Sequence, residues 1–410
     1  MLFFDNDPEI IKHGYYQVDG IKTLSKFEAY KFAQGDISKI QFLYNEEIMS
    51  KHDWTREPSE DIYELYGRRA KQLRNKYDYI VLLYSGGIDS HTVLKSFLDN
   101  NVHLDEICTL TNAQVESKTG KFNQEVFNAA IPFVSSLDLA RLGTKFRLFD
   151  ISDLVINQFQ DDFVLEHWHL YNQGLGNHWT SAVRSHILKS KVDDHLQLAE
   201  QGKSVCYIWG FDKPIMTCEN NQYSIRIADA SVDLNMRQFI NRKMLTEKLA
   251  NFYDEPFYTC SEFPEISIKQ GHLLLKLIKT LSSTDERLRS QDELATTGPF
   301  VAHHRAEYYR FLPKKMVDGA IYPQANLLQF GDDKVRGSII LSPKDNWFSH
   351  SNHENQHRWF QNLDNLIREN QGFYRFRDNK VVGINFILSR PYCIGEFRAF
   401  ETKDNDVNKK

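Results

Sequence analysis

The stretch Tyr79–Asn100, YIVLLYSGGIDSHTVLKSFLDN, decides the fold that the sequence predicts. An apolar run leads into the polar segment Ser85–Ser90, and apolar residues then recur at helical spacing (Val93, Leu94, Phe97 and Leu98). This pattern predicts a strand, a tight loop and a helix. Glycines allow a sharp turn that aims backbone N–H groups at a ligand, and a helix start adds further N–H groups and a positive dipole end. The stretch therefore predicts a cradle for phosphate groups.

The loop differs from the Walker phosphate loop, because no lysine follows its glycines. The hydroxyls of Ser85 and Ser90 can donate to phosphate oxygens, and the carboxylate of Asp89 can hold a metal or orient the loop. A serine and glycine turn with an aspartate cap, as at many strand–helix junctions, is the alternative. The five fixed positions together, placed between a strand and a helix, favour phosphate binding.

The S-G-G-x-D-S pattern of Ser85, Gly86, Gly87, Asp89 and Ser90 resembles the PP-loop of the N-type ATP pyrophosphatases. That superfamily includes asparagine synthetase, GMP synthetase, argininosuccinate synthetase, NAD synthetase and several tRNA-modifying enzymes. The resemblance implies ATP and Mg²⁺ as cofactors and cleavage of ATP between its α- and β-phosphates. It also implies that a carbonyl or carboxyl oxygen of an acceptor is adenylated and that a nucleophile then displaces AMP.

The chain divides into three stretches by its pattern of apolar residues. Residues 1–76 predict a small α+β segment, with a hairpin that turns at Asp19-Gly20 and a helix capped by Ser25. Residues 77–245 alternate strand and helix, with strands near 79–83, 104–110, 145–151 and 204–209, which indicates an α/β domain with a parallel sheet. The resemblance implies the doubly wound sheet of the adenine-nucleotide α-hydrolase-like (HUP) fold. Residues 246–410 predict a mixed α/β domain that forms a lid or an acceptor site.

Ligands of such sheets bind at the carboxyl ends of the strands, where the strand order reverses. The resemblance implies that the adenosine lies at the ends of the first two strands, and the backbone of Ile88 completes the loop. The implied adenosine contacts are Leu83, Tyr84, Thr109, Leu110 and Thr111.

The segment GFDKP at residues 210–214 follows the fourth predicted strand. Departure of pyrophosphate builds negative charge that a metal ion and a cationic side chain must neutralise. Asp212 is therefore the expected second Mg²⁺ ligand, and Lys213 is the expected phosphate contact. A plain turn with both charges in solvent is the alternative. Arg184, expected one turn into a helix, faces either the α-phosphate or water.

The predicted helix 60–76 carries Arg68, Arg69, Lys71, Arg74 and Lys76. A basic run of this kind is more often a solvated helix face than a substrate-binding patch, so we expect a solvated face. The net charge of −5 argues against a broad surface for nucleic acid but permits a local basic groove.

The five scattered cysteines form no C-x-x-C pair, which favours free thiols in a reducing compartment. No apolar run is long enough for a membrane span, and the first residues lack the basic and apolar segments of a secretory signal. The expectation is therefore a cytoplasmic protein that does not contact a membrane.

Several members of the superfamily are excluded by what the sequence lacks. Position 2 is Leu2, whereas class II amidotransferases have a nucleophilic cysteine there. The segments LRNKYDYIVLLYSGGIDSHTVLKSFLDNN and IWGFDKP are most similar to asparagine synthase-like PP-loop proteins of large tailed phages. The resemblance implies a free-standing, AMP-forming ligase or amidotransferase in which Asp89, Asp212 and Lys213 are catalytic.

Three questions stay open at this point. The acceptor is a small molecule or tRNA, and the ammonia or amine donor comes from solution or from a partner protein. A nucleotide-binding module without catalysis is the alternative of a different class. The sequence also leaves open whether the protein forms a homodimer.

Overall fold

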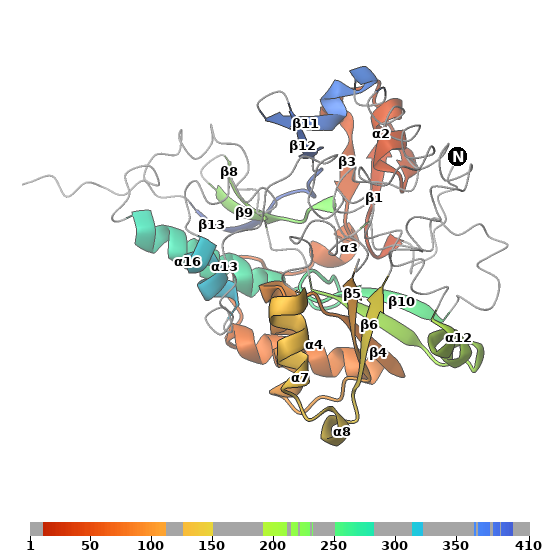
Figure 1. Cartoon of the computed structure of the whole chain (residues 1–410). Coiled ribbons are helices and arrows are strands. Elements are labelled where there is room, and N and C mark those ends of the chain that lie inside the picture. Colours follow the sequence, from red (N-terminus) through yellow and green to blue (C-terminus); the bar gives the residue numbers. More distant parts are fainter. Residues whose placement is uncertain are drawn as a thin grey trace, which may run out of the picture.

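A computed structural model describes residues 11–111, 126–150, 192–210, 215–219, 222–229, 232, 251–282, 314–322, 365, 368–377, 380–385 and 387–396. Its centre is a parallel sheet with the strand order β10-β7-β4-β5-β6 (Figure 1). The strands are β4 (Tyr79–Leu83), β5 (Glu106–Thr111), β6 (Lys145–Asp150), β7 (Val205–Trp209) and β10 (Phe252–Pro256). The predicted α/β class and four of these strands are confirmed, whereas β10 was not predicted.

The order of the strands is compatible with a doubly wound fold. Numbered along the chain, the five strands lie in the order 5-4-1-2-3, so the chain first builds the sheet outward from β4 on one side and then returns to the other side. Helix α5 (Ile88–Leu98) packs on one face of the sheet, and α12 (Asp193–Glu200) packs on the opposite face. The reversal of strand order falls between β4 and β7.

The apolar pattern of residues 121–142 predicts a helix with Pro132 inside it, and so a kink or two pieces. The described part of this segment is broken. A short π-helical turn, Val126–Ala130, leads into α7 (Ile131–Ser135), and α8 (Leu139–Leu142) follows separately. Pro132 lies in the first turn of α7, where its missing N–H removes no helical hydrogen bond. A change from π-helical to α-helical geometry at Pro132 agrees with the kink or break expected there, and the further gap between α7 and α8 was not predicted. The buried residues Ala130 and Val134 pack on the α5 side of the sheet.

Helix α4 (Ile62–Lys76) precedes the sheet strands and packs beside α5 on the same face. A reciprocal capping box starts it: the N–H of Glu64 donates to Asp61 (2.8 Å), and the N–H of Asp61 donates to the Glu64 carboxylate (3.1 Å). The predicted N-terminal segment 1–76 includes this helix, but in space the helix belongs to the helical layer over the sheet.

The expected solvated basic face of α4 is wrong for Arg69. Its side chain has no exposed surface, and its guanidinium donates to the Glu255 carboxylate and to the carbonyl of Pro256, both at 3.0 Å. Lys12 and Lys76 also pair with Glu255, at 3.3 and 3.2 Å. The spacing of polar and apolar residues along a helix cannot predict such an ion pair, because the carboxylate partner of Arg69 lies 186 residues away in the chain.

The N-terminal residues form a three-stranded antiparallel sheet in the order β2-β1-β3. Its strands are β1 (Tyr15–Val18), β2 (Ile21–Thr23) and β3 (Gln41–Leu43), with η1 (Ile37–Lys39) before β3 and α3 (Glu46–Met49) after it. The predicted hairpin turn is confirmed, because Asp19 and Gly20 both have positive φ (49° and 82°). Ser25 caps α2 (Lys26–Phe32) as expected, by accepting from the N–H of Glu28.

A second antiparallel sheet, ordered β13-β9-β8, packs against the long helix α13 (Glu265–Ser282). Its strands are β8 (Ile215–Glu219), β9 (Gln222–Arg226) and β13 (Tyr392–Glu396). Helix α16 (Lys314–Ile321) lies against α13 (Figure 1). The apolar runs 373–376 and 381–388 predict a hairpin. The structure confirms it as β11 (Tyr374–Arg377) and β12 (Lys380–Ile384), which follow η9 (Gln371–Phe373). Two sheets thus take strands from both sides of residue 245, where the sequence analysis placed a domain boundary.

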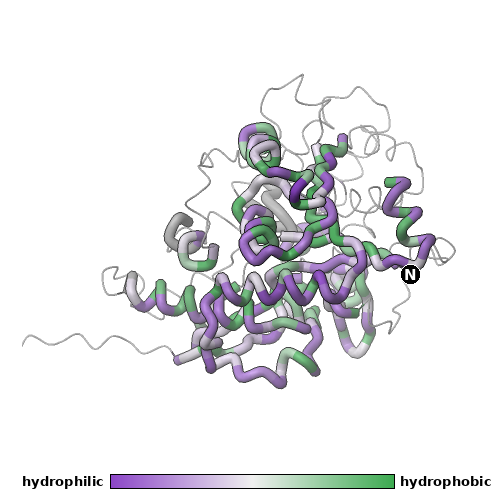
Figure 2. Tube along the Cα trace, turned by 90° about the horizontal axis from the view of Figure 1, so that it is seen from below, coloured by the Kyte–Doolittle hydropathy of each residue, from purple (hydrophilic) through white to green (hydrophobic). Residues whose placement is uncertain are grey.

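The hydrophobic core continues through these parts. One cluster of buried residues joins the N-terminal sheet, the α4 and α5 layer and α13, and a smaller cluster lies under α12. Green and purple segments alternate along the helices in Figure 2, as expected for helices with one buried face. All five cysteines are free thiols, as predicted. No helix within the described ranges is long and apolar enough to cross a membrane.

The pairing of Arg69 with Glu255 predicts a large stability effect. Replacing Glu255 by glutamine leaves a buried guanidinium without its counter-charge, so we expect the free energy of unfolding to fall by about 3–5 kcal/mol. Urea titration measures the change. Glu262→Gln is the matched control, since Glu262 pairs with Lys76 on the surface and should change stability by less than about 1 kcal/mol. Equal effects of the two substitutions would contradict the prediction.

The same carboxylate predicts a dependence of stability on pH. Burial by itself raises the pKa of Glu255, but Lys12, Arg69, Lys76 and the Tyr77 hydroxyl outweigh burial and hold that pKa well below its usual range. Its contribution to stability is therefore complete above the unfolded-state pKa of about 4.3 and is lost as the pH falls below that value. The difference in urea midpoint between the wild type and Glu255→Gln should shrink between pH 5 and pH 3. A difference that stays constant would contradict this linkage.

Candidate functional site

The segment Ser85–Ser90 joins the carboxyl end of β4 to the start of α5, as the sequence predicted. It lies beside the end of β7, because Leu83 pairs in register with Trp209. The strand order reverses between these two strands, and ligands of open parallel sheets bind at such a reversal. The loop therefore occupies the position at which this fold is expected to bind a ligand.

Glycines and serines fix the shape of the loop. Gly86 has a φ of +79°, which a side chain would strain. The buried Ser90 hydroxyl accepts from the N–H of Ser85 (3.2 Å) and donates to the carbonyl of Gly87 (3.1 Å). The Ser85 hydroxyl accepts from the N–H of Gly87 at 3.3 Å. The two serines thus hold the turn closed, a role that the sequence analysis did not assign to them.

Gly210, the residue after β7, is the closest described neighbour of the loop from that strand. A Cβ built at this glycine would lie 2.8 Å from the Cα of Ser90 and 3.0 Å from its N. No real Cβ tolerates such distances to backbone atoms, so only glycine lets β7 end against the first turn of α5. The sequence showed Gly210 only as the end of a strand.

The start of α5 suits an anion. Gly87 is the N-cap and has no side chain that could accept from the N–H groups of the first turn. The helix dipole adds positive potential at this end, and the Ser85 side chain is exposed beside it. A phosphate group at this position would receive backbone and hydroxyl hydrogen bonds together. The residues of the loop therefore fit the polyphosphate of ATP.

Asp89, in the first turn of α5, is half-buried and faces a group of buried tyrosines. Burial, and then the charge of the nearby Asp89 carboxylate, raise the pKa of Tyr322 well above its usual value. The same two causes contribute to the raised pKa of Tyr66 and Tyr258. Asp89 fits the role of one carboxylate ligand of a divalent cation such as Mg²⁺. The expected second ligand, Asp212, lies outside the described residues, as do Lys213 and Arg184.

The residues expected around adenosine lie at the ends of β4 and β5, but several of their polar groups have partners inside the protein. The Tyr84 ring is buried, and its hydroxyl is 3.0 Å from Nδ1 of His91, whose pKa burial lowers to about 4. The Thr109 hydroxyl donates to the carbonyl of Tyr84 at 2.7 Å, and Thr111 is also buried. Leu83 packs in the cluster on the α12 side of the sheet, and Leu110 contacts the clusters on both sides. The Tyr84 and Thr109 side chains therefore shape the strand ends from within.

A second polar cluster lies at the amino end of β5, away from the loop. Glu106, Asp194 and His195 each offer a ligand atom, and these atoms lie within 4.8 Å of one another. Arg147 donates to both carboxylates at 2.6 Å, and His195 bonds to Glu106 (3.0 Å) and to the Tyr207 hydroxyl (2.6 Å). The guanidinium already supplies the positive charge that a metal would bring, so this cluster ties β5, β6 and α12 together as an ion-pair network.

The contact between Gly210 and Ser90 predicts the effect of a single methyl group. Gly210→Ala should displace the first turn of α5 and lower the free energy of unfolding by about 1–3 kcal/mol, which urea titration measures. Gly319→Ala in α16 is the control, because a Cβ there meets no atom within 4 Å and alanine is a better helix former than glycine. Wild-type stability in Gly210→Ala would contradict this packing.

Sequence comparison leaves the family of the chain unassigned: neither protein-family models nor curated proteins give a match. The function of the chain must therefore be inferred from the loop, from its position in the sheet and from the residues that contact it.

Proposed function

We propose that this protein is an ATP pyrophosphatase-type enzyme that cleaves MgATP to AMP and pyrophosphate and adenylates an oxygen of an acceptor. A carbonyl or carboxyl oxygen of the acceptor attacks the α-phosphate, and ammonia, an amine or another nucleophile then displaces AMP. One observation carries the proposal: an S-G-G-x-D-S loop lies at the carboxyl end of β4, where the strand order of a parallel sheet reverses. The adenylation step is supported by the resemblance of this loop to the PP-loop.

The loop residues have separate roles in the proposed reaction. The backbone N–H groups at the start of α5 and the Ser85 hydroxyl bind the phosphates that leave as pyrophosphate, and Ser90 holds the turn in shape. Asp89 would hold Mg²⁺, which when bound neutralises charge on the phosphate oxygens. Asp212 and Lys213 are proposed as a second carboxylate and a cation for the leaving pyrophosphate. A carboxylate acceptor needs no general base, because its oxygen is already a nucleophile.

The acceptor is proposed to be a small molecule. A tRNA acceptor would need a basic surface, for which the candidates are basic residues of the C-terminal part and helix α4. Four of its five basic residues pair with carboxylates: Arg68 with Glu60, Arg69 with Glu255, Arg74 with Asp105, and Lys76 with Glu255 and Glu262. Phosphates would have to displace these carboxylates before the helix could bind RNA.

The test is incubation of the protein with Mg²⁺ and α-labelled ATP, with and without an extract of small molecules, followed by separation of AMP from ADP. AMP formed only with the extract is the expected result, and fractionation of the extract then identifies the acceptor. Formation of ADP, or tight ATP binding without AMP under every condition, would contradict the proposal and favour a nucleotide-binding module.

A pair of variants on the two ends of α5 localises the activity. Asp89→Asn keeps the size of the side chain but removes its charge. Loss of a residue that only orients a metal ligand lowers activity by up to about 100-fold. Because Asp89 is proposed as a ligand itself, we expect AMP formation to fall by at least about 100-fold. Asp99→Asn is the matched control at the other end of the helix, where Asp99 pairs with Lys95 near the surface. Full activity in Asp89→Asn would rule out the proposed site.

A further inference from the structure

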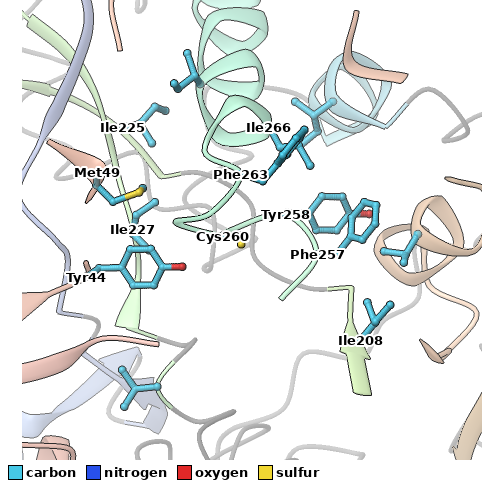
Figure 3. Packing of buried hydrophobic residues seen from close by; sticks show 14 of the residues in the cluster. Tyr44, Met49, Ile208, Ile225, Ile227, Phe257, Tyr258, Cys260, Phe263 and Ile266 are labelled. Atoms are coloured by element: carbon cyan, nitrogen blue, oxygen red, sulfur yellow. The ribbon is translucent and has the colours of Figure 1, made fainter. Parts of the chain in front are cut away.

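Three buried tyrosines from separate parts of the chain meet beside the first turn of α5. Tyr66 comes from α4, Tyr258 follows β10, and Tyr322 follows α16. The ring of Tyr258 lies 5.5 Å from that of Tyr66 and 5.4 Å from that of Tyr322, measured between centroids. Figure 3 shows Tyr258 beside Phe257, between the start of α13 at Ile266 and the strand residue Ile208. Each of the three rings is at most 1% exposed.

The hydroxyl of Tyr258 reaches the backbone of α5. It donates to the main-chain carbonyl of Asp89, with an O–O distance of 2.5 Å. Helix geometry pairs that carbonyl with the N–H four residues later, so the tyrosine uses the second lone pair of the oxygen. A buried hydroxyl is costly without a partner, and packing alone would be served equally well by phenylalanine. The hydrogen bond therefore fixes the residue that the proposed function assigns to the metal.

Tyr322 lies near the side chain of the same residue. Its ring packs against Tyr258, whose hydroxyl bonds to Asp89, and after burial the charge of the Asp89 carboxylate is the largest cause that raises the pKa of Tyr322. The position of Tyr322 is fixed from two directions: its N–H donates to the carbonyl of Asp318 at 2.8 Å, and the preceding carbonyl, of Ile321, accepts from the Tyr66 hydroxyl at 2.5 Å. Gln270 of α13 donates in turn to the Tyr66 hydroxyl at 2.8 Å. Hydrogen bonds from α13 through Tyr66 of α4 to the end of α16 thus fix the backbone next to Tyr322.

Given the proposed function, we infer that Tyr258 and Tyr322 are positioning residues that hold Asp89 for a divalent cation. Tyr258 fixes the backbone of Asp89, and Tyr322 fixes the direction of its carboxylate. Groups that orient a metal ligand in this way change metal affinity or activity by about 10- to 100-fold when they are removed. The C-terminal part of the chain therefore completes the site through α16, which brings Tyr322 to the first turn of α5.

The experiment compares phenylalanine substitutions, which remove a hydroxyl and keep the ring. In Tyr258→Phe and Tyr322→Phe we expect the Mg²⁺ concentration for half-maximal ATP binding to rise by about 10- to 100-fold. Binding of ATP in the presence of a chelator should stay within about threefold of the wild type, because the loop that binds the phosphates is intact. Calorimetric titration with MgATP and with metal-free ATP measures both quantities.

Tyr16→Phe is the matched control. Tyr16 is fully buried and its hydroxyl donates to the Asp229 carboxylate at 2.9 Å in the N-terminal part of the structure, so the substitution removes a similar bond elsewhere. Its Mg²⁺ dependence should equal that of the wild type even where its thermal stability falls. If Tyr258→Phe does not fold, Tyr322→Phe decides the test.

The outcomes separate this inference from the proposed function. Variants that bind MgATP with the Mg²⁺ dependence of the wild type would overturn the positioning role and leave the proposed function standing. A wild-type protein that binds no ATP, or binds it equally well with and without Mg²⁺, would overturn both. A shift in Tyr16→Phe as large as in Tyr258→Phe and Tyr322→Phe would show a general loss of stability and would also overturn the positioning role.

Discussion

The buried ion pair between Arg69 and Glu255 determines how the layers of this protein fit together. A guanidinium without exposed surface needs a carboxylate at a fixed distance, so α4 has one position against the end of β10. Tyr66 lies almost one helical turn before Arg69, and Tyr258 lies three residues after Glu255. The ion pair therefore brings the rings of Tyr66 and Tyr258 into contact. It also positions the Tyr258 hydroxyl for its hydrogen bond to the Asp89 carbonyl.

The parallel sheet then determines where a ligand is expected to bind. Parallel strands direct their carboxyl ends to one edge, and the reversal of order between β4 and β7 separates the connections that leave those two strands. The loop after β4 and Gly210 after β7 meet at that point, with a separation that excludes a Cβ. The polar cluster of Glu106, Asp194 and His195 lies at the opposite edge, where Arg147 neutralises it. The ion pairs of this cluster stabilise the packing of β5, β6 and α12.

Much of the fold was predictable because its signals are local. The strand, loop and helix of Tyr79–Asn100, the Asp19-Gly20 turn and the Ser25 cap all depend on residues a few positions apart, and the structure has each of them. Strand β10 was not predictable in this way. It carries Asp254 and Glu255 and ends in proline, so it lacks the continuous apolar run of a buried parallel strand, and its charges are satisfied by Trp209 and by Arg69.

The local sequence was enough to predict the strand, the tight turn and the helix start around Ser85–Ser90, because glycine flexibility, serine hydroxyls and a helix start are properties of six consecutive residues. Only the tertiary structure decided that Arg69 is buried, that β10 completes the sheet and that Tyr258 and Tyr322 lie beside Asp89. The contacts of Arg69 with Glu255 and of Tyr258 with Asp89 join residues more than 160 positions apart. A local pattern cannot predict such partners. A tyrosine or arginine at helical spacing looks the same in the sequence whether its side chain contacts water or a buried carboxylate.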